Sequence, residues 1–192
     1  MKIFQDHHGI LRTQQAIRLG ISPRTLYQMR DTSLLLCESR GLYRLAEMEL
    51  TSNTDLIQTA MRIPRGVICL ISALAFQQLT TQIPHKVYIA LPIDAEKPRL
   101  EYPPLRIFWL SQKAYSAGIE NHELDGISVK IYGIEKTIAD CFKFRNKIGL
   151  DVALEALKNY RKHEGFNIGT LLKYARINRV ERIIKPYLEA IV

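Results

Sequence analysis

The segment GISPRTLYQMRD, residues 20–31, gathers polar side chains that could contact nucleic acid. Ser22 suits a helix N-cap and Pro23 suits the first helical turn, so a helix is expected to begin here. Leu26 and Met29 would face the core. The outer face then carries the candidate DNA contacts, which are Arg24, Tyr27 and Gln28, with Thr25 at its border and Ser22 at its start. With this helix in the major groove, Arg24, Tyr27 and Gln28 would point toward the DNA. Ser22 and the backbone amides of the first turn would contact phosphate. A solvated helix face without a ligand is the alternative.

Two further arginines fall in the segment SLLLCESRGLYRLAE, residues 33–47. Its pattern predicts two short strands about a turn near 39–41, with Tyr43 on one face and Arg44 on the other. Arg40 and Arg44 would contact phosphate or the minor groove, because an arginine beside a glycine lets the backbone approach the duplex. Ordinary surface charge is the alternative for both.

The elements that position these residues follow the order of a winged helix. A short helix is expected near the start of the chain, and a second helix over residues 13–19 would bury Ala16, Ile17 and Leu19. The helix that begins at Ser22 and the hairpin after it complete a winged helix-turn-helix DNA-binding domain over residues 1–50. The segment MELTSNT, residues 48–54, predicts the linker that follows.

Residues 51–192 predict a mixed α+β domain that ends in several helices. The segments HKVYIALP and LRIFWL have the β-branched and aromatic residues of strands, and Asp125-Gly126 marks a hairpin turn. From Ile134 onward the apolar spacing becomes helical. Helices are expected over 54–62, 70–79, 134–145, 150–163, 168–176 and 179–191, with Asp151, Asn167 and Asn178 as candidate caps. The expected fold class is therefore α+β.

The formal charge of +8 over 192 residues predicts an anionic partner, nucleic acid before membrane. Lysines and arginines exceed acidic residues in the first 44 residues and again after Asp140. Four of them recur about three residues apart and form a candidate auxiliary basic stripe for DNA, RNA or a protein partner: Lys173, Arg176, Arg179 and Arg182. A solvated face is the alternative, since a break near 177–178 leaves the alignment of the second pair open.

The sequence gives no support to catalytic or metal chemistry. It contains no Gly-rich phosphate loop, HExxH or GxSxG motif, and its five histidines are scattered. The three cysteines are far apart without a CxxC pair, which argues against a disulfide framework or a structural zinc. No cofactor is expected. The start lacks a cationic segment followed by an apolar run, and about 18 apolar residues never occur together, so a cytoplasmic protein is expected.

Four segments together resemble the AbiE-type antitoxin family: GILRTQQAIRLGISPRTLYQMRD, SRGLYRLAE, TTQIPHKVYIALP and EKTIADCFKFRNKIGLDVALEAL. The resemblance spans residues 9–160. It implies a transcriptional autorepressor whose winged helix binds inverted repeats of double-stranded DNA in its own promoter. It also implies an antitoxin of a type IV toxin–antitoxin module for abortive phage infection. The C-terminal domain, residues 51–192, would counteract a neighbouring nucleotidyltransferase-like toxin without needing a stable complex, and 80–92 with 135–150 are the first segments to consider.

Two other functions remain open from the residues alone. The winged helix could contact a protein partner instead of DNA, which would make the chain a protein-interaction module. Alternatively, the chain could be a nuclease that its winged helix directs to DNA. The commonest nuclease signature is missing, however, because no glutamate in the chain is followed by a lysine two positions later. The expectation favoured here is a phage-defence regulator that is not an enzyme.

Overall fold

The computed structural model describes residues 1–7, 9–39, 41–47 and 53–191. The chain forms two compact units: the first holds Met1–Thr54 and Leu124–Ile127, and the second holds Asp55–Glu123 and Ser128–Val192. Both contain helices and a sheet, so the mixed α+β class is confirmed. The predicted boundary after residue 50 lies within 48–52, outside the described residues.

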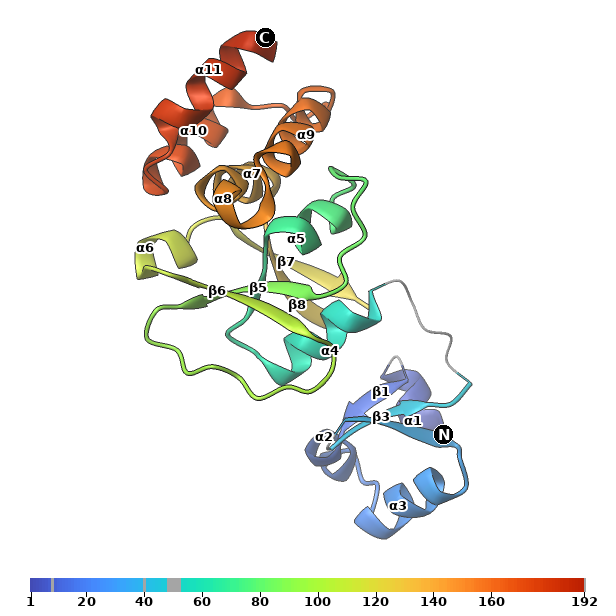
Figure 1. Cartoon of the computed structure of the whole chain (residues 1–192). Coiled ribbons are helices and arrows are strands. Elements are labelled where there is room, and N and C mark those ends of the chain that lie inside the picture. Colours follow the sequence, from blue (N-terminus) through green and yellow to red (C-terminus); the bar gives the residue numbers. More distant parts are fainter. Residues whose placement is uncertain (8, 40, 48–52, 192) are drawn as a thin grey trace. The chain divides into compact units, whose positions relative to one another are not determined.

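The described residues of the first unit form three helices and a three-stranded antiparallel sheet (Figure 1). Its elements in chain order are α1 (Lys2–Asp6), β1 (Ile10–Arg12), α2 (Thr13–Arg18), α3 (Pro23–Asp31), β2 (Leu35–Ser39) and β3 (Leu42–Leu45). The central strand is β3, where Tyr43 stands opposite Leu11 on β1 and Cys37 on β2. The three predicted helices and the hairpin are confirmed. The strand β1 was not predicted, because three residues are too short to show an alternating pattern.

The core of the first unit forms where the helices cover the sheet. Its buried members are Phe4, Leu11, Ala16, Ile21, Leu26, Leu35, Tyr43 and Leu45. The prediction for α2 was wrong in part, because Ile17 and Leu19 are 43% and 39% exposed whereas Ala16 is buried. The helix has only six residues and ends at Arg18, so it presents a single residue of its apolar row to the core.

The second unit is built on a five-stranded mixed sheet with the order β6-β5-β4-β8-β7. Its strands are β4 (Val67–Ile68), β5 (Val87–Pro92), β6 (Leu105–Leu110), β7 (Ile119–Leu124) and β8 (Ile127–Tyr132). Strand β5 runs parallel to β6 and antiparallel to β4, which in turn runs parallel to β8. The predicted hairpin turn at Asp125-Gly126 is confirmed by its two positive φ angles, 48° and 72°, which a two-residue turn of this kind requires.

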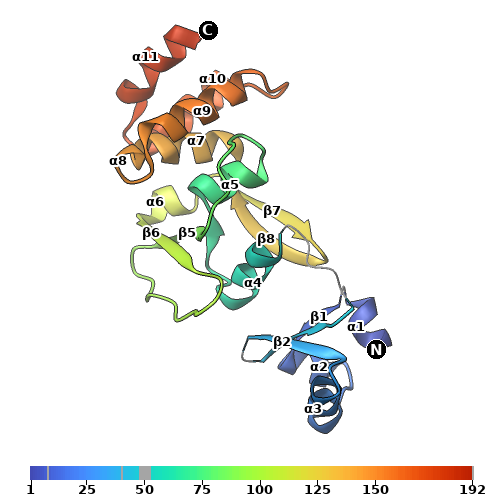
Figure 2. The same cartoon turned by 45° about the vertical axis from the view of Figure 1, so that its right-hand side comes forward.

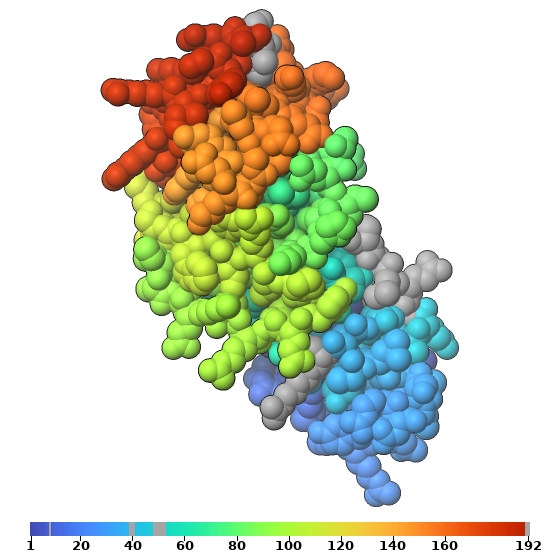
Figure 3. Space-filling model, in the orientation of Figure 1, coloured from blue at the N-terminus to red at the C-terminus, as the bar shows by residue number. Residues whose placement is uncertain are grey.

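Helices lie on both sides of this sheet, as Figures 1 and 2 show. They are α4 (Thr54–Arg62), α5 (Leu70–Phe76), α6 (Gln112–Tyr115), α7 (Ile134–Lys143), α8 (Arg145–Ile148), α9 (Leu150–Arg161), α10 (Ile168–Ile177) and α11 (Glu181–Ile191). In both views α5 and the C-terminal helices lie on one side and α4 on the other. The orange and red atoms of Figure 3 show the C-terminal helices packed together without a gap.

Helix α7 is the centre of the second unit. It packs against α5, α9 and α10, and every residue from 136 to 142 is buried. Because five of these seven side chains are apolar or small, they fill the core, but Lys136 and Asp140 bring two charged groups into it. The expected helix over 134–145 is in fact two, since Phe144 separates α7 from α8.

Candidate nucleic-acid interface

Helix α3 begins with the predicted cap. The Ser22 hydroxyl oxygen accepts the Thr25 backbone N–H at 3.1 Å and lies 2.8 Å from the Thr25 hydroxyl. Pro23 occupies the first turn, as expected. Since Pro23 has no N–H and Ser22 takes that of Thr25, the Arg24 N–H is the amide left in this turn to meet a phosphate.

The exposed face of α3 carries the side chains predicted for DNA contact. Leu26 is completely buried, and Met29 packs partly buried against the same core. The outer side chains, all exposed, are Ser22, Arg24, Thr25, Tyr27 and Gln28. Three of them, with Asp31 and Thr32, line a shallow hollow along the helix. The helix therefore presents one polar, cationic face to solvent.

Arg30 adds to this face, although sequence reasoning left it out. Its guanidinium carbon lies 5.2 Å from the centre of the Tyr27 ring, so it stacks on an aromatic group at the surface. Arg30 also forms an ion pair with Asp31 at 2.7 Å. The aspartate offsets its charge, whereas no ion pair among the described residues involves Arg24.

The two arginines predicted to lie on a wing, Arg40 and Arg44, differ in what the structure shows of them. Arg40 lies outside the described residues. Arg44 is a correction: its side chain is 8% exposed, and its Nε donates to a carboxylate oxygen of Glu38 at 2.7 Å. Its guanidinium also donates to the Leu45 carbonyl at 3.1 Å. Because Glu38 lies across the same hairpin, Arg44 serves the hairpin's own ion pair and is not the surface cation that was predicted.

The auxiliary basic stripe is exposed but does not follow one helix. Lys173 and Arg176 lie on α10, and Arg182 lies on α11. Arg179 lies in the turn between them with a φ of 59°, which breaks the helical phase. Arg176 pairs with Glu181 at 3.1 Å, so part of the stripe's charge is already balanced.

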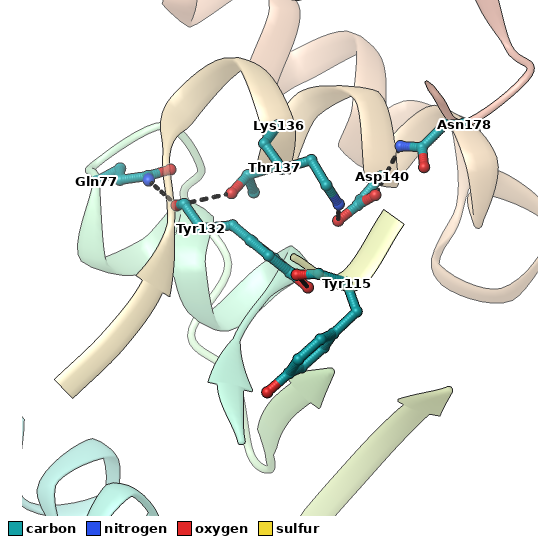
Figure 4. Close-up of polar contacts among 7 residues, drawn as sticks. All are labelled: Gln77, Tyr115, Tyr132, Lys136, Thr137, Asp140 and Asn178. Carbon is teal, nitrogen blue, oxygen red and sulfur yellow. Dashed lines mark hydrogen bonds and ion pairs between the residues drawn. The ribbon is translucent and has the colours of Figure 1, made fainter. Parts of the chain in front are cut away.

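A second group of polar side chains lies inside the second unit (Figure 4). The Lys136 ammonium lies 2.5 Å from a carboxylate oxygen of Asp140 and 4.0 Å from the centre of the Tyr132 ring. The other Asp140 oxygen accepts the Asn178 amide N–H at 2.7 Å. The Tyr132 hydroxyl donates to the Tyr115 carbonyl at 2.7 Å. Lys136 and Asp140 are 0% and 1% exposed, so this group supports the fold and offers no surface for substrate.

The prediction of Asn178 as an N-cap was wrong, because Asn178 is the C-cap of α10 and its buried side-chain amide donates to Asp140. The cap prediction for Asp151 was also wrong, because α9 begins after Gly149 without a side-chain cap. Asn167 is confirmed, since its side-chain oxygen accepts the Thr170 N–H at 2.9 Å.

The described residues hold neither a metal-ligand cluster nor a helix that could span a membrane. Within these ranges, no three His, Cys, Asp or Glu side chains lie close enough to hold a metal ion. No helix in the described part of the chain is long and apolar enough to cross a membrane.

Comparison with known families gives a match on the unit that carries α3. Residues 1–46 match the family described as "Transcriptional regulator, AbiEi antitoxin". This match covers every element from α1 to β3 and stops before the second unit. No curated protein matches the chain. The resemblance drawn from the sequence is confirmed over residues 1–46, which are similar to that family.

Proposed function

We propose that the protein is a DNA-binding autorepressor and the antitoxin of a type IV toxin–antitoxin operon for abortive phage infection. In this proposal the first unit is a winged helix-turn-helix, with α3 as recognition helix and β2–β3 as wing. The observation that supports it most is the division of α3 into two faces. Leu26 lies in the core while Arg24, Tyr27 and Gln28 are exposed, within the residues that match the regulator family.

DNA binding would begin with α3 in the major groove. Arg24 and Gln28 are four residues apart, so both side chains project from the same side of the helix. Their guanidinium and amide groups can donate hydrogen bonds to base edges. Thr25 and Tyr27 flank them, and the Arg24 N–H with the Ser22 cap faces phosphate. Inverted repeats in its own promoter are the proposed target.

The wing would add contacts that do not depend on sequence. Arg40, which lies outside the described residues, is the proposed wing contact, and Arg44 is assigned to its ion pair with Glu38 instead. The basic stripe is proposed to contact the DNA that flanks each half of the inverted repeat. An RNA or the toxin is the alternative partner. The residues of the stripe are Lys173, Arg176, Arg179 and Arg182. Such contacts raise affinity for any DNA and make it depend on salt.

The second unit is proposed to counteract a nucleotidyltransferase-like toxin from a neighbouring gene, without enzymatic activity and in the cytoplasm. The two segments considered first, 80–92 and 135–150, are mostly core. Strand β5 is buried on both faces, and seven consecutive residues of α7 are buried. Any contact with a toxin must therefore come from the exposed residues beside these elements, in the loop before β5 and around α8.

The test is to titrate the protein with its own promoter DNA and with random DNA at two salt concentrations. The proposal predicts tighter binding to the promoter, and a binding constant that falls with salt for both DNAs because phosphate contacts release counterions. Equal, weak binding to both DNAs would remove the autorepressor function. Growth protection against the neighbouring toxin tests the antitoxin function separately, and a full-length chain that gives no protection would remove it.

A further inference from the structure

The loop between α5 and β5 is attached at its start to α9. The Glu155 carboxylate accepts the N–H and the hydroxyl of Thr81, each at 2.9 Å, and the hydroxyl of Thr80 at 2.8 Å. The Asn159 amide donates to the Leu79 carbonyl at 3.1 Å. The Thr81 N–H above all holds the pKa of Glu155 below its usual range. The carboxylate therefore stays charged at neutral pH and keeps this end of the loop in place.

The end of the same loop is attached to α5. The hydroxyl of Ser72, a buried residue, donates to the Lys86 carbonyl at 3.4 Å and accepts the Tyr88 N–H at 2.9 Å. Between the two attachments lies Ile83, which is 83% exposed and is followed by Pro84. A large aliphatic side chain this exposed adds almost nothing to the core. The loop therefore holds an apolar surface in solvent that can contact a ligand with little loss of conformational entropy.

A groove of about 370 Å³ lies beside this loop. Sites for small molecules have volumes of about 300–1,000 Å³, so the groove is large enough for one. Ile71, Ile83 and Pro84 give it apolar lining, while Lys86 and Arg106 give it positive charge. No acidic side chain among the described residues lines it. The groove therefore fits a small anion that also has an apolar part.

Arg106 is oriented in this groove by neutral groups. Its guanidinium donates to the Tyr88 hydroxyl at 3.2 Å and to the Lys147 carbonyl at 2.7 Å. Neither acceptor balances its charge, and no ion pair among the described residues involves Arg106 or Lys86. A guanidinium has more N–H donors than these two bonds use. Arg106 thus keeps both its charge and free donors for an anionic ligand.

We propose that this groove binds a nucleoside triphosphate, with Lys86 and Arg106 on the phosphates and the base against Ile83 and Pro84. Arginine binds phosphate through paired N–H donors and lysine binds it as a point charge. The exposed Ile83 favours a nucleotide over inorganic phosphate, which has no apolar surface to offer it, whereas a base has flat and largely apolar faces. The inference goes beyond the proposed function, because DNA binding by α3 requires no small-molecule ligand in the second unit.

The experiment titrates the full-length protein separately with ATP, GTP, CTP and UTP, with inorganic tripolyphosphate and with a short polyglutamate peptide. Two groove variants are compared with wild type: Lys86→Gln removes a charge and Ile83→Ser removes the apolar contact. The controls make the same changes at Lys97 and at Ile93, which are exposed in the same unit but do not line the groove. Since all four side chains are exposed, each variant should keep the fold, which circular dichroism and thermal unfolding check.

The inference predicts that the wild-type protein binds at least one of the nucleotides with a Kd of about 1 mM or below. The nucleotide should bind more tightly than tripolyphosphate, because only the nucleotide has a base to contact the loop. Lys86→Gln should weaken nucleotide binding about tenfold or more, since it removes a charge-assisted contact. Ile83→Ser should weaken it about threefold or more, since it removes apolar contact. Both controls should match wild type.

A wild-type protein that binds none of the nucleotides overturns the inference. Nucleotide affinity that is unchanged in either groove variant also overturns it, because the ligand then lies elsewhere or makes no contact with the loop. Tripolyphosphate that binds as tightly as the nucleotide identifies a site for phosphate alone, and polyglutamate that binds more tightly identifies a site for an acidic peptide; either result contradicts the inference. Promoter binding by α3 is measured separately and does not depend on any of these results.

Discussion

Replacing Asp140 by alanine would leave the Lys136 ammonium inside the second unit without its counter-ion. Both side chains are essentially inaccessible, and they are 2.5 Å apart. Removing one partner of a buried pair costs about 3–5 kcal/mol, because the remaining charge stays desolvated. The change also removes the acceptor of the Asn178 amide. Since a whole domain is stable by only about 5–15 kcal/mol, the loss would be a large part of the total.

The assay is urea unfolding followed by the fluorescence of Trp109, the single tryptophan, which lies on β6 of the second unit. The Asp140→Ala and Lys136→Met variants should each lose about 3–5 kcal/mol. The double variant Lys136→Met with Asp140→Leu removes both charges, so it should lose only about 1–3 kcal/mol, mainly from the unpaired Asn178 amide. Additive losses, or single losses below about 1 kcal/mol, would refute the description of a desolvated pair.

Three further predictions concern single features of the structure. Ser22→Ala should cost about 0.5–2 kcal/mol in the first unit, measured by thermal unfolding, because it removes the α3 cap; unchanged stability would contradict the cap. Glu155→Gln should destabilise the protein at pH 7, and the difference should shrink as the pH falls from about 4.5 through the lowered pKa of Glu155, since protonation removes the same interaction; a pH-independent difference would contradict it. A thiol reagent should label one cysteine of the native protein, the exposed Cys37, and all three after unfolding, because burial raises the pKa of Cys69 and Cys141.

Features set by local chemistry could be predicted from the sequence. The Ser22 cap and Pro23 fix the start of α3, and the Asp125-Gly126 turn fixes the β7–β8 hairpin. The long apolar periodicity after Ile134 predicted the C-terminal helices. Helical spacing also predicted which face of α3 is exposed, because it placed Leu26 on the opposite, buried face.

Features set by contacts between distant elements could not be predicted. Strands β1 and β4 have three and two residues, so only their neighbours in the sheet define them. The Arg44–Glu38 pair depends on strand register, which the spacing of the two residues does not reveal. Lys136 and Asp140 are four apart, which is typical of an exposed helical ion pair. Their burial, and the role of Asn178, follow from the packing of α10 against α7.

The most direct test of the central claim is the affinity of an Arg24→Ala, Gln28→Ala variant for the promoter and for random DNA. Lys2→Ala is the control, since it removes a positive charge from the exposed surface of α1 in the same unit. If α3 reads the promoter, each lost base contact should weaken promoter binding by about 1–3 kcal/mol, with a much smaller change for random DNA and little effect of Lys2→Ala. Promoter binding equal to wild type, in a variant whose circular dichroism shows an intact fold, would contradict the assignment of α3 as the recognition helix.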